Sequence, residues 1–224
     1  MPSPSTFPKL SIIIPVLNEG VVLRSCLEKL PLTADPSSEI EVIISDGGSQ
    51  DDTVEIARDF PVTIIYSPAG RAEQMNAGAN AARGKTLLFL HADTILPASG
   101  CESVIASIES GFSMGCFDRK FSGTSSILKK TSVWAGWRVR KAFWAYGDQA
   151  MFIRHDVFVH VGGFKPLPRF EDLDLAIRAK RHGTWTVLPG PVISDGRRFK
   201  NGTLRRVIGD FLLTVGWLTG IVRK

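Results

Sequence analysis

Apolar, strand-like runs alternate with amphipathic segments through the first half of the chain. The apolar runs are rich in Ile, Val and Leu and stand at residues 10–17, 40–48, 61–67 and 86–91. Segments with the spacing of one-sided helices follow the first three runs, at residues 19–30, 51–60 and 70–84. Repeated strand-helix-strand units with short connections predict an α/β fold, a Rossmann-like and mostly parallel sheet with helices on both faces.

Polar residues follow three of the predicted strands at the point where each strand ends. They are Asn18 and Glu19, then Asp46 to Ser49, and finally His91 to Asp93. The carboxyl ends of parallel strands meet at one edge of a sheet, where open α/β folds bind their ligands. We therefore expect the three groups to converge on one ligand-binding rim, although caps of the following helices would explain any one of them.

The second half of the chain has a less regular pattern. It predicts, in order, a strand, a helix, an extended segment, one or two helical turns and a second helix, at residues 115–123, 125–143, 147–154, 155–164 and 170–183. The last helix is amphipathic, with Leu173, Ala176 and Ile177 on its apolar side. We expect one domain over residues 10–200, preceded by a loose lead of residues 1–9.

An apolar segment at residues 207–222 is sixteen residues long and is interrupted by Asp210. As a helix it would reach roughly 24 Å, which is short of the roughly 30 Å hydrocarbon core of a bilayer. The flanking arginines suit an amphipathic helix at a membrane surface, and packing on the domain or on a second subunit is the alternative. We expect residues 201–224 to form this C-terminal helix, and its removal to change membrane association or solubility rather than chemistry.

Composition and charge narrow the class of protein. The 224 residues are 44% hydrophobic and 22% charged, which is ordinary for a globular enzyme. The formal net charge of +5 favours an anionic ligand or membrane surface, and the cations do not form the long stripe typical of nucleic-acid binding. Three cysteines without paired spacing, and no signal peptide, indicate a cytoplasmic protein. A cytoplasmic protein that also binds the inner face of the membrane is equally compatible with these features.

Asp93 offers a carboxylate at the predicted rim. Mg²⁺ and Mn²⁺ prefer oxygen ligands and bridge protein carboxylates to substrate phosphates, so we predict that Asp93 holds a divalent metal. His91 is a candidate second ligand, or else it satisfies local backbone groups. Arg71 follows Gly70 at a predicted helix start, where its guanidinium and the free backbone N–H groups would face a diphosphate; a solvated arginine is the alternative.

Six short motifs stand in a fixed order along the chain. They are PVLNEG, DGGSQDDT, GRAEQMNAGANAARG, FLHADT, GDQAMFIR followed by VGGF, and EDLDLAIR. Over roughly residues 10–200 their order and spacing resemble glycosyltransferase family 2, of the GT-A fold, and look closest to its rSAM/selenodomain-associated branch, the arsenosugar-biosynthesis type. The resemblance implies an inverting transfer of a sugar from a nucleoside-diphosphate sugar to a hydroxyl acceptor, small or lipid-linked, with Mn²⁺ or Mg²⁺ as the cofactor.

The resemblance also implies roles for residues on the donor side. Asp46 is implied to contact the base, and Asp93 matches the final Asp of the family's DxD motif, which is the metal ligand. His91 stands where that motif has its first Asp, and Gly47 stands where many members have a second Asp, so fewer carboxylates line the rim than in a typical member. The residues predicted to bind the donor are Pro15, Asn18, Glu19, Asp46, Gly48, Ser49, Arg71, His91 and Ala92.

Asp172 is the predicted general base. An inverting transfer needs a carboxylate that removes the proton of the acceptor hydroxyl, and the family's Glu-Asp pair, here Glu171 and Asp172, supplies it. Acids at a helix start also compensate the helix dipole, which is the structural alternative. The residues expected around the acceptor are Gly147, Asp148 and Gln149, with Arg197 and Arg198 as phosphate ligands or as an exposed basic turn.

Two other classes of protein stay open. A nucleotidyltransferase shares the sheet architecture, but it would be expected to have a Gly-rich loop with a basic residue after the first strand, which PVLNEG lacks. A non-catalytic nucleotide-sugar-binding protein would keep Asp46 and Asp93 without needing an acceptor base, so the Glu171–Asp172 pair argues against it. A homo-oligomer is compatible with each of these classes.

Overall fold

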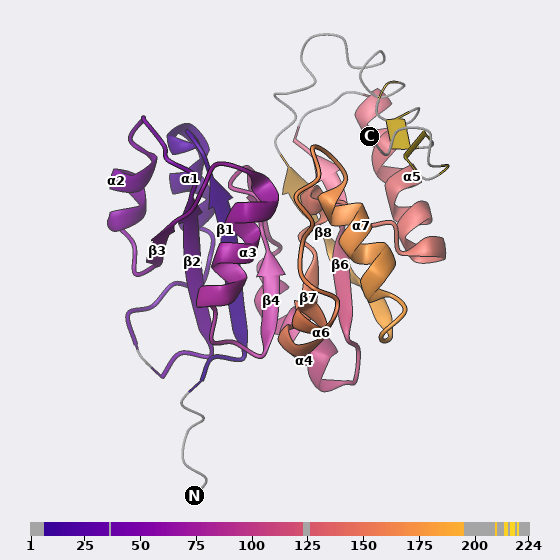
Figure 1. Ribbon diagram of the computed structural model, residues 1–224, viewed down its shortest axis with the longest axis horizontal. Helices are drawn as coiled ribbons and strands as arrows, with labels where there is room; N and C mark the ends of the chain where they lie inside the picture. Colours follow the sequence, from indigo (N-terminus) through magenta and orange to yellow (C-terminus); the bar gives the residue numbers. More distant parts are fainter. Residues whose placement is uncertain are drawn as a thin grey trace, which may run out of the picture.

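A single mixed sheet organises the molecule. The computed structural model describes residues 7–35, 37–122 and 126–194, and the single positions 209, 213, 214, 216, 217 and 219. Within these residues the strands follow the order β3-β2-β1-β4-β7-β6-β8-β5 (Figure 1). The predicted α/β class is therefore confirmed.

The first half of the chain forms the parallel part of the sheet. Its strands are β1 (Leu10–Val16), β2 (Ile40–Asp46), β3 (Thr63–Tyr66) and β4 (Thr86–Phe89). Its helices are α1 (Gly20–Leu27), α2 (Thr53–Arg58) and α3 (Arg71–Ala81). Each pairing among these strands is parallel, and every element lies within its predicted segment.

The apolar run of β1 is continuous because both faces of the sheet are covered. Ile12 and Ile14 belong to one hydrophobic core, together with apolar residues of α1. Ile13, which points to the other face, belongs to a second core with Met75 of α3. A Cβ on Gly78 would stand 2.3 Å from Cγ2 of Ile13, so glycine at this position lets α3 lie close against the strand.

The second half contributes four more strands and the remaining helices. The strands are β5 (Thr94–Ile95), β6 (Met114–Phe121), β7 (Phe152–Arg154) and β8 (Trp185–Ser194). The helices are α4 (Gly100–Glu109), α5 (Ser126–Ala142), the 3₁₀ helix η1 (Gly147–Gln149), α6 (His155–His160) and α7 (Glu171–Ala179). Strand β7 runs antiparallel to β4 and to β6 and so joins the two halves of the sheet.

Three details of this half differ from the sequence prediction. The pattern did not predict β5, α4 or β8. Residues 147–154 do not form one extended segment, because η1 precedes β7. On α7, Leu173 and Ala176 are buried as predicted, but Leu175 is fully buried whereas Ile177 is only partly so.

The C-terminal segment falls mostly outside the described residues, as do residues 1–6 of the predicted lead. Thr214 and Trp217, which are described, pack against Tyr146 and Phe170 of the domain. In the described part of the chain, no helix is both long enough and apolar enough to cross a membrane.

Candidate active site

The three polar groups predicted at strand ends do share one edge of the sheet. Strand β1 lies between β2 and β4 and is parallel to both. Val16 at the end of β1 is level with Asp46 at the end of β2, and Pro15 is level with Ser45. The predicted convergence of the strand ends is therefore confirmed, and the loops that follow β1, β2 and β4 form the edge at which we predict the donor rim.

The loops after β1 and β2 are fastened to each other by hydrogen bonds. The backbone N–H of Asn18 donates to Oγ of Ser49 (2.9 Å), and Oδ1 of Asn18 accepts from the N–H of Gln50 (2.7 Å). The N–H of Glu19 donates to Oγ1 of Thr53 (2.8 Å). Asn18 has a φ of 55°, a left-handed conformation that asparagine tolerates better than most residues.

Asp46 orders the loop that follows it. Its side chain is buried, with 2% of the residue exposed. The carboxylate accepts the backbone N–H of Gly48 at 2.9 Å and that of Ser49 at 3.2 Å. Gly48 has a φ of 94°, which favours glycine. Asp46 thus fixes the shape of the rim around the predicted nucleotide site.

Gln74 is a rim residue that the sequence prediction missed. From α3, its buried Nε2 donates to the carbonyl of Val16 (2.7 Å) and to that of Ser45 (2.9 Å). One amide group therefore ties together the ends of β1 and β2. The motif GRAEQMNAGANAARG contains the residue, but the long-range partners of a glutamine cannot be read from local spacing.

The connection from β4 to β5 carries His91, Ala92 and Asp93. Ala92 is buried, and His91 and Asp93 are half-buried. Oδ1 of Asp93 accepts a hydrogen bond from Oγ1 of Thr94 at 3.3 Å. Thr94 belongs to β5, which pairs with β8, so the carboxylate stands on a short segment held at both ends by the sheet.

The two acids at the start of α7 have different surroundings. Glu171 Oε1 accepts from Nη1 of Arg71 at 2.9 Å, which joins α7 to α3. Oδ2 of Asp172 accepts the backbone N–H of Gly147 at 2.9 Å. Its Oδ1 is buried and, among the described residues, has no hydrogen-bond partner.

Burial, and secondarily the charge of Glu171, raise the pKa of Asp172 to about 7, against the smaller opposing effect of Arg71. A carboxyl group that titrates there can take up a proton near neutral pH. Glu171, by contrast, has a guanidinium partner. The pair therefore contains one carboxylate held by an ion pair and one carboxyl group suited to proton transfer.

Gly147 brings the two sides of the site together. A Cβ at this position would stand 2.5 Å from Nε2 of His91 and 2.7 Å from Oδ2 of Asp172. The backbone of η1 therefore lies close to both the imidazole that follows β4 and the carboxyl group of α7. A side chain at this position would displace one of these groups.

The other two residues of η1, Asp148 and Gln149, are held by contacts with β6 and α5. Asp148 forms an ion pair with Arg119 of β6. Oε1 of Gln149 accepts from Nη2 of Arg138 on α5 (3.2 Å), and its Nε2 donates to the carbonyl of Phe117 (3.2 Å). Sequence reasoning selected Asp148 and Gln149 but missed both arginines. Arg197 and Arg198, the predicted phosphate ligands, lie outside the described residues.

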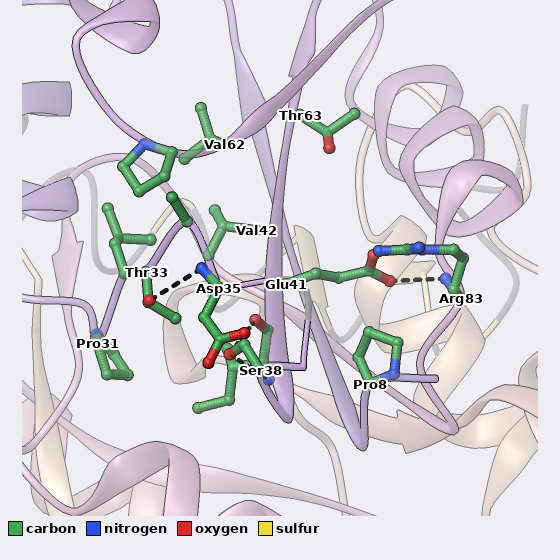
Figure 2. A pocket seen from close by; sticks show the side chains of 14 residues that line it. Pro8, Pro31, Thr33, Asp35, Ser38, Glu41, Val42, Val62, Thr63 and Arg83 are labelled. Atoms are coloured by element: carbon green, nitrogen blue, oxygen red, sulfur yellow. Dashed lines mark hydrogen bonds and ion pairs between the residues drawn. The ribbon is translucent and has the colours of Figure 1, made fainter. Parts of the chain in front are cut away.

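A pocket of about 260 Å³ lies at the opposite edge of the sheet, at the amino ends of β2 and β3 (Figure 2). Glu41 and Arg83, which line it, form an ion pair with each other at 3.0 Å. Asp35 accepts the N–H of Ser37 at 2.8 Å. Because Glu41 and Arg83 pair with each other and Asp35 bonds to Ser37, we place the functional site at the carboxyl edge instead.

The fold is that of known nucleotide-sugar-binding structures. It is similar to a mannosyltransferase from Pyrobaculum calidifontis in complex with GDP-Man and Mn²⁺, with a TM-score of 0.70 and 18% identity over 100% of this chain and 67% of that one. It is also similar to S. aureus TarS in complex with UDP-GlcNAc, with a TM-score of 0.65 and 17% identity over 84% of this chain and 59% of that one. The architecture is therefore GT-A, as predicted.

Within this class the sequence identifies the family. The family model described as glycosyl transferase family 2 matches residues 11–169, more than half of the chain, and the chain belongs to that family. An uncharacterized glycosyltransferase of Haemophilus influenzae is 29% identical over 190 residues, which cover 79% of this chain and 64% of the relative. The chain thus spans less than two thirds of the length of this relative.

Proposed function

We propose that the protein is an inverting glycosyltransferase that moves a sugar from a nucleoside-diphosphate sugar to a hydroxyl acceptor. The observation that carries the proposal is the buried carboxyl group of Asp172, which lies beside η1 with a pKa raised to about 7. Family membership supports the transfer of a sugar. The complexes of structural neighbours with GDP-Man and UDP-GlcNAc support a nucleotide-sugar donor.

In the proposed reaction Asp172 is the general base. Its Oδ1 takes the proton of the acceptor hydroxyl while the acceptor oxygen bonds to the anomeric carbon. The bond from that carbon to the diphosphate oxygen breaks on the opposite face, which inverts the configuration. Oδ2 stays bound to the N–H of Gly147, so the carboxyl group keeps its orientation as its charge changes.

Glu171 and Arg71 hold the start of α7 against α3 in this scheme. Their ion pair, at 2.9 Å, joins the acceptor-side helix to the first turn of the helix that borders the donor rim. Nearly half of the Arg71 side chain is exposed, so its remaining N–H groups can reach a diphosphate. A bidentate guanidinium is well suited to that role.

A divalent cation fits this site if the donor supplies most of its ligands. Among the described residues there is no group of three His, Cys, Asp or Glu that could hold a metal by itself. Mg²⁺ is commonly held by one or two carboxylates plus substrate phosphates, and Asp93 is such a carboxylate. When bound, the cation would neutralise charge on the leaving diphosphate. The Mn²⁺ in the mannosyltransferase complex supports this assignment.

The finer parts of the proposal rest on the sequence. They are the rSAM/selenodomain-associated branch, the domain limits, a cytoplasmic location, a lipid-linked or small acceptor, and contact of the C-terminal helix with a membrane. Two alternatives remain distinct: a nucleotidyltransferase and a non-catalytic nucleotide-sugar-binding protein. The raised pKa of Asp172, which burial causes, favours a catalyst over a binder, because a mere binder has no use for a proton acceptor.

Asp172→Asn tests the proposal. The change keeps the shape of the side chain but removes its basicity, so transfer should fall about 10²-fold or more, while calorimetry should show unchanged affinity for UDP-GlcNAc or GDP-Man. The matched control is Asp174→Asn on the same helix, whose carboxylate instead pairs with Arg178 at 2.6 Å. Wild-type turnover in Asp172→Asn would reject the role, and lost donor affinity would mean that this residue shapes the nucleotide site.

A further inference from the structure

The side chain of Phe170 contacts two other aromatic side chains, Tyr146 and Trp217, near the start of α7. The ring of Phe170 lies 6.3 Å from that of Tyr146 and 5.9 Å from that of Trp217, measured between centroids. Each of the three residues is partly exposed. We call Tyr146, Phe170 and Trp217 the aromatic cluster. Its members come from the end of the α5–η1 connection, the start of α7 and the C-terminal segment.

The cluster adjoins both elements that hold Asp172. Tyr146 directly precedes Gly147, whose N–H donates to the carboxyl group of Asp172. Phe170 directly precedes Glu171, the first residue of α7. The segments that hold Asp172 therefore also carry two of the three rings.

Phe170 adopts a backbone conformation that its side chain disfavours. Its φ is 66° and its ψ is 21°, in the left-handed region, at the N-cap position of α7. Such a conformation costs roughly 1–2 kcal/mol for a residue with a Cβ. Phenylalanine also supplies no hydrogen bond to the free N–H groups of the helix start. A partly exposed ring on a strained backbone position, close in sequence to the proposed base, points to function rather than to stability.

Tyr146 is fixed from two directions. The guanidinium carbon of Arg138, itself 2% exposed, lies 3.9 Å from the centre of the Tyr146 ring. The Tyr146 hydroxyl shares a hydrogen bond with Oγ1 of Thr214 at 2.8 Å. The same contact holds Thr214 beside Tyr146, and Trp217, which follows Thr214 in the chain, completes the cluster. A rigid aromatic wall of this kind binds flat apolar faces with little loss of conformational entropy.

We propose that the aromatic cluster is the acceptor-binding wall and that it selects acceptors whose hydroxyl is carried on, or next to, a ring with an apolar face. The proposal rests on the proposed function, since it assigns the second substrate of that reaction. A sugar ring and a phenyl ring both offer such a face. An anionic group is not favoured here, because Arg119 is already paired with Asp148 and Arg138 lies beneath the Tyr146 ring.

The test measures binding of small probes to the full-length chain by saturation-transfer NMR. The probes are methyl pyranosides and benzyl alcohol as ring compounds, with glycerol as the compound that has hydroxyls but no ring. We expect signals from ring compounds and none above background from glycerol. A response to pyranosides alone identifies a sugar acceptor, and a response to benzyl alcohol alone identifies an aromatic one. Equal signals from glycerol and the ring compounds would overturn the proposal.

Two variants locate the binding. Phe170→Asn removes the ring but suits both the left-handed conformation and the N-cap position, so it should fold at least as well as the wild type. Trp217→Leu removes the second ring. Each should lower the ring-compound signal about fivefold or more, whereas Trp137→Leu, which changes an exposed tryptophan of α5, should not. Unchanged signals in both cluster variants would also overturn the proposal.

A parallel measurement separates this inference from the proposed function. The thermal shift caused by UDP-GlcNAc or GDP-Man reports the donor site, and it should be the same in the wild type and in the cluster variants. If neither donor nor any other nucleotide sugar shifts the wild type, the proposed function fails. If donors shift it but ring compounds bind no better than glycerol, only the aromatic wall fails.

Discussion

Glu171 and Asp172 show how environment separates two neighbouring acids. Both are buried at the start of one helix, where either acid would compensate the helix dipole. Glu171 forms an ion pair with Arg71, whereas Asp172 accepts a hydrogen bond from the backbone N–H of Gly147. The motif predicts Asp172 as the base, and the different partners of the two acids support that choice over Glu171.

The raised pKa of Asp172 makes a prediction about stability. Burial brings this pKa from about 4 when unfolded to about 7 when folded. Between these two pKa values the folded protein therefore holds a proton that the unfolded chain has released. This bound proton stabilises the folded state, and the stabilisation is lost as the pH rises through about 7. A change of this size corresponds to at most about 4 kcal/mol.

Asp172→Asn should therefore be more stable than the wild type above pH 7 and should gain little near pH 4. The increase in Tm at pH 8 should be several degrees, since 1 kcal/mol corresponds to roughly 2–4 °C in a protein of this size. The measurement is Tm against pH for both proteins, with Asp174→Asn as the control. Parallel curves for the wild type and Asp172→Asn would contradict the raised pKa.

At the scale of elements, the parallel half of the fold could be predicted and the other half only in part. Runs such as LSIIIPV are recognisable as strands because nearly every residue is apolar when both faces of a strand are covered. Strand β8, WTVLPGPVIS, contains Pro-Gly-Pro, which argues against a strand. The structure accommodates these residues at an irregularity, where the register with β6 shifts between Phe117 and Arg119.

The candidate site likewise has one part that could be predicted from the sequence and one part that could not. The convergence of the loops after β1, β2 and β4 follows from strand order alone. The 3₁₀ helix η1 could not be predicted, because its shape depends on Arg138 and on the carbonyl of Phe117, both distant in sequence. The same holds for Trp217, since the pattern predicts a C-terminal helix unconnected with the chemistry. Its contact with Phe170 argues for a role beside the acceptor.

Gln74 gives a prediction for how α3 supports the rim. Gln74→Ala leaves the carbonyls of Val16 and Ser45 without their side-chain donor in a buried position, which should lower the free energy of unfolding by about 2–3 kcal/mol. The ends of β1 and β2 lose their shared tie, so the thermal shift with nucleotide sugars should also shrink. Gln50→Ala, at an exposed loop position, is the control. Full stability and full donor response in Gln74→Ala would show that the strand ends need no such tie.

At the scale of the whole molecule, the proposed site lies where the two halves of the sheet meet. The parallel half supplies the proposed donor rim, and η1 and α7 supply Gly147 and Asp172. The contacts that join them include the Arg71–Glu171 ion pair and the close approach of Gly147 to His91. Because the proposed donor and acceptor groups come from different halves, a ligand that touches both should stabilise their arrangement as well as its own site.

Donor binding should therefore raise the melting temperature of the whole chain, and should do so through Asp93. A nucleotide sugar at about 100 times its Kd stabilises the folded state by about 2.7 kcal/mol, or roughly 5–10 °C for a protein of this size. With UDP-GlcNAc or GDP-Man we expect this shift in Mn²⁺ and a much smaller one after chelation with EDTA. Asp93→Asn should abolish the metal-dependent part of the shift. Its own melting temperature without ligand should stay near that of the wild type, because the hydrogen bond of this half-buried carboxylate within the described part of the chain is a long one, 3.3 Å to Thr94. His91→Ala is the neighbouring control and should reduce the shift less. A full Mn²⁺-dependent shift in Asp93→Asn would remove Asp93 as the metal ligand and with it the proposed arrangement of the donor rim.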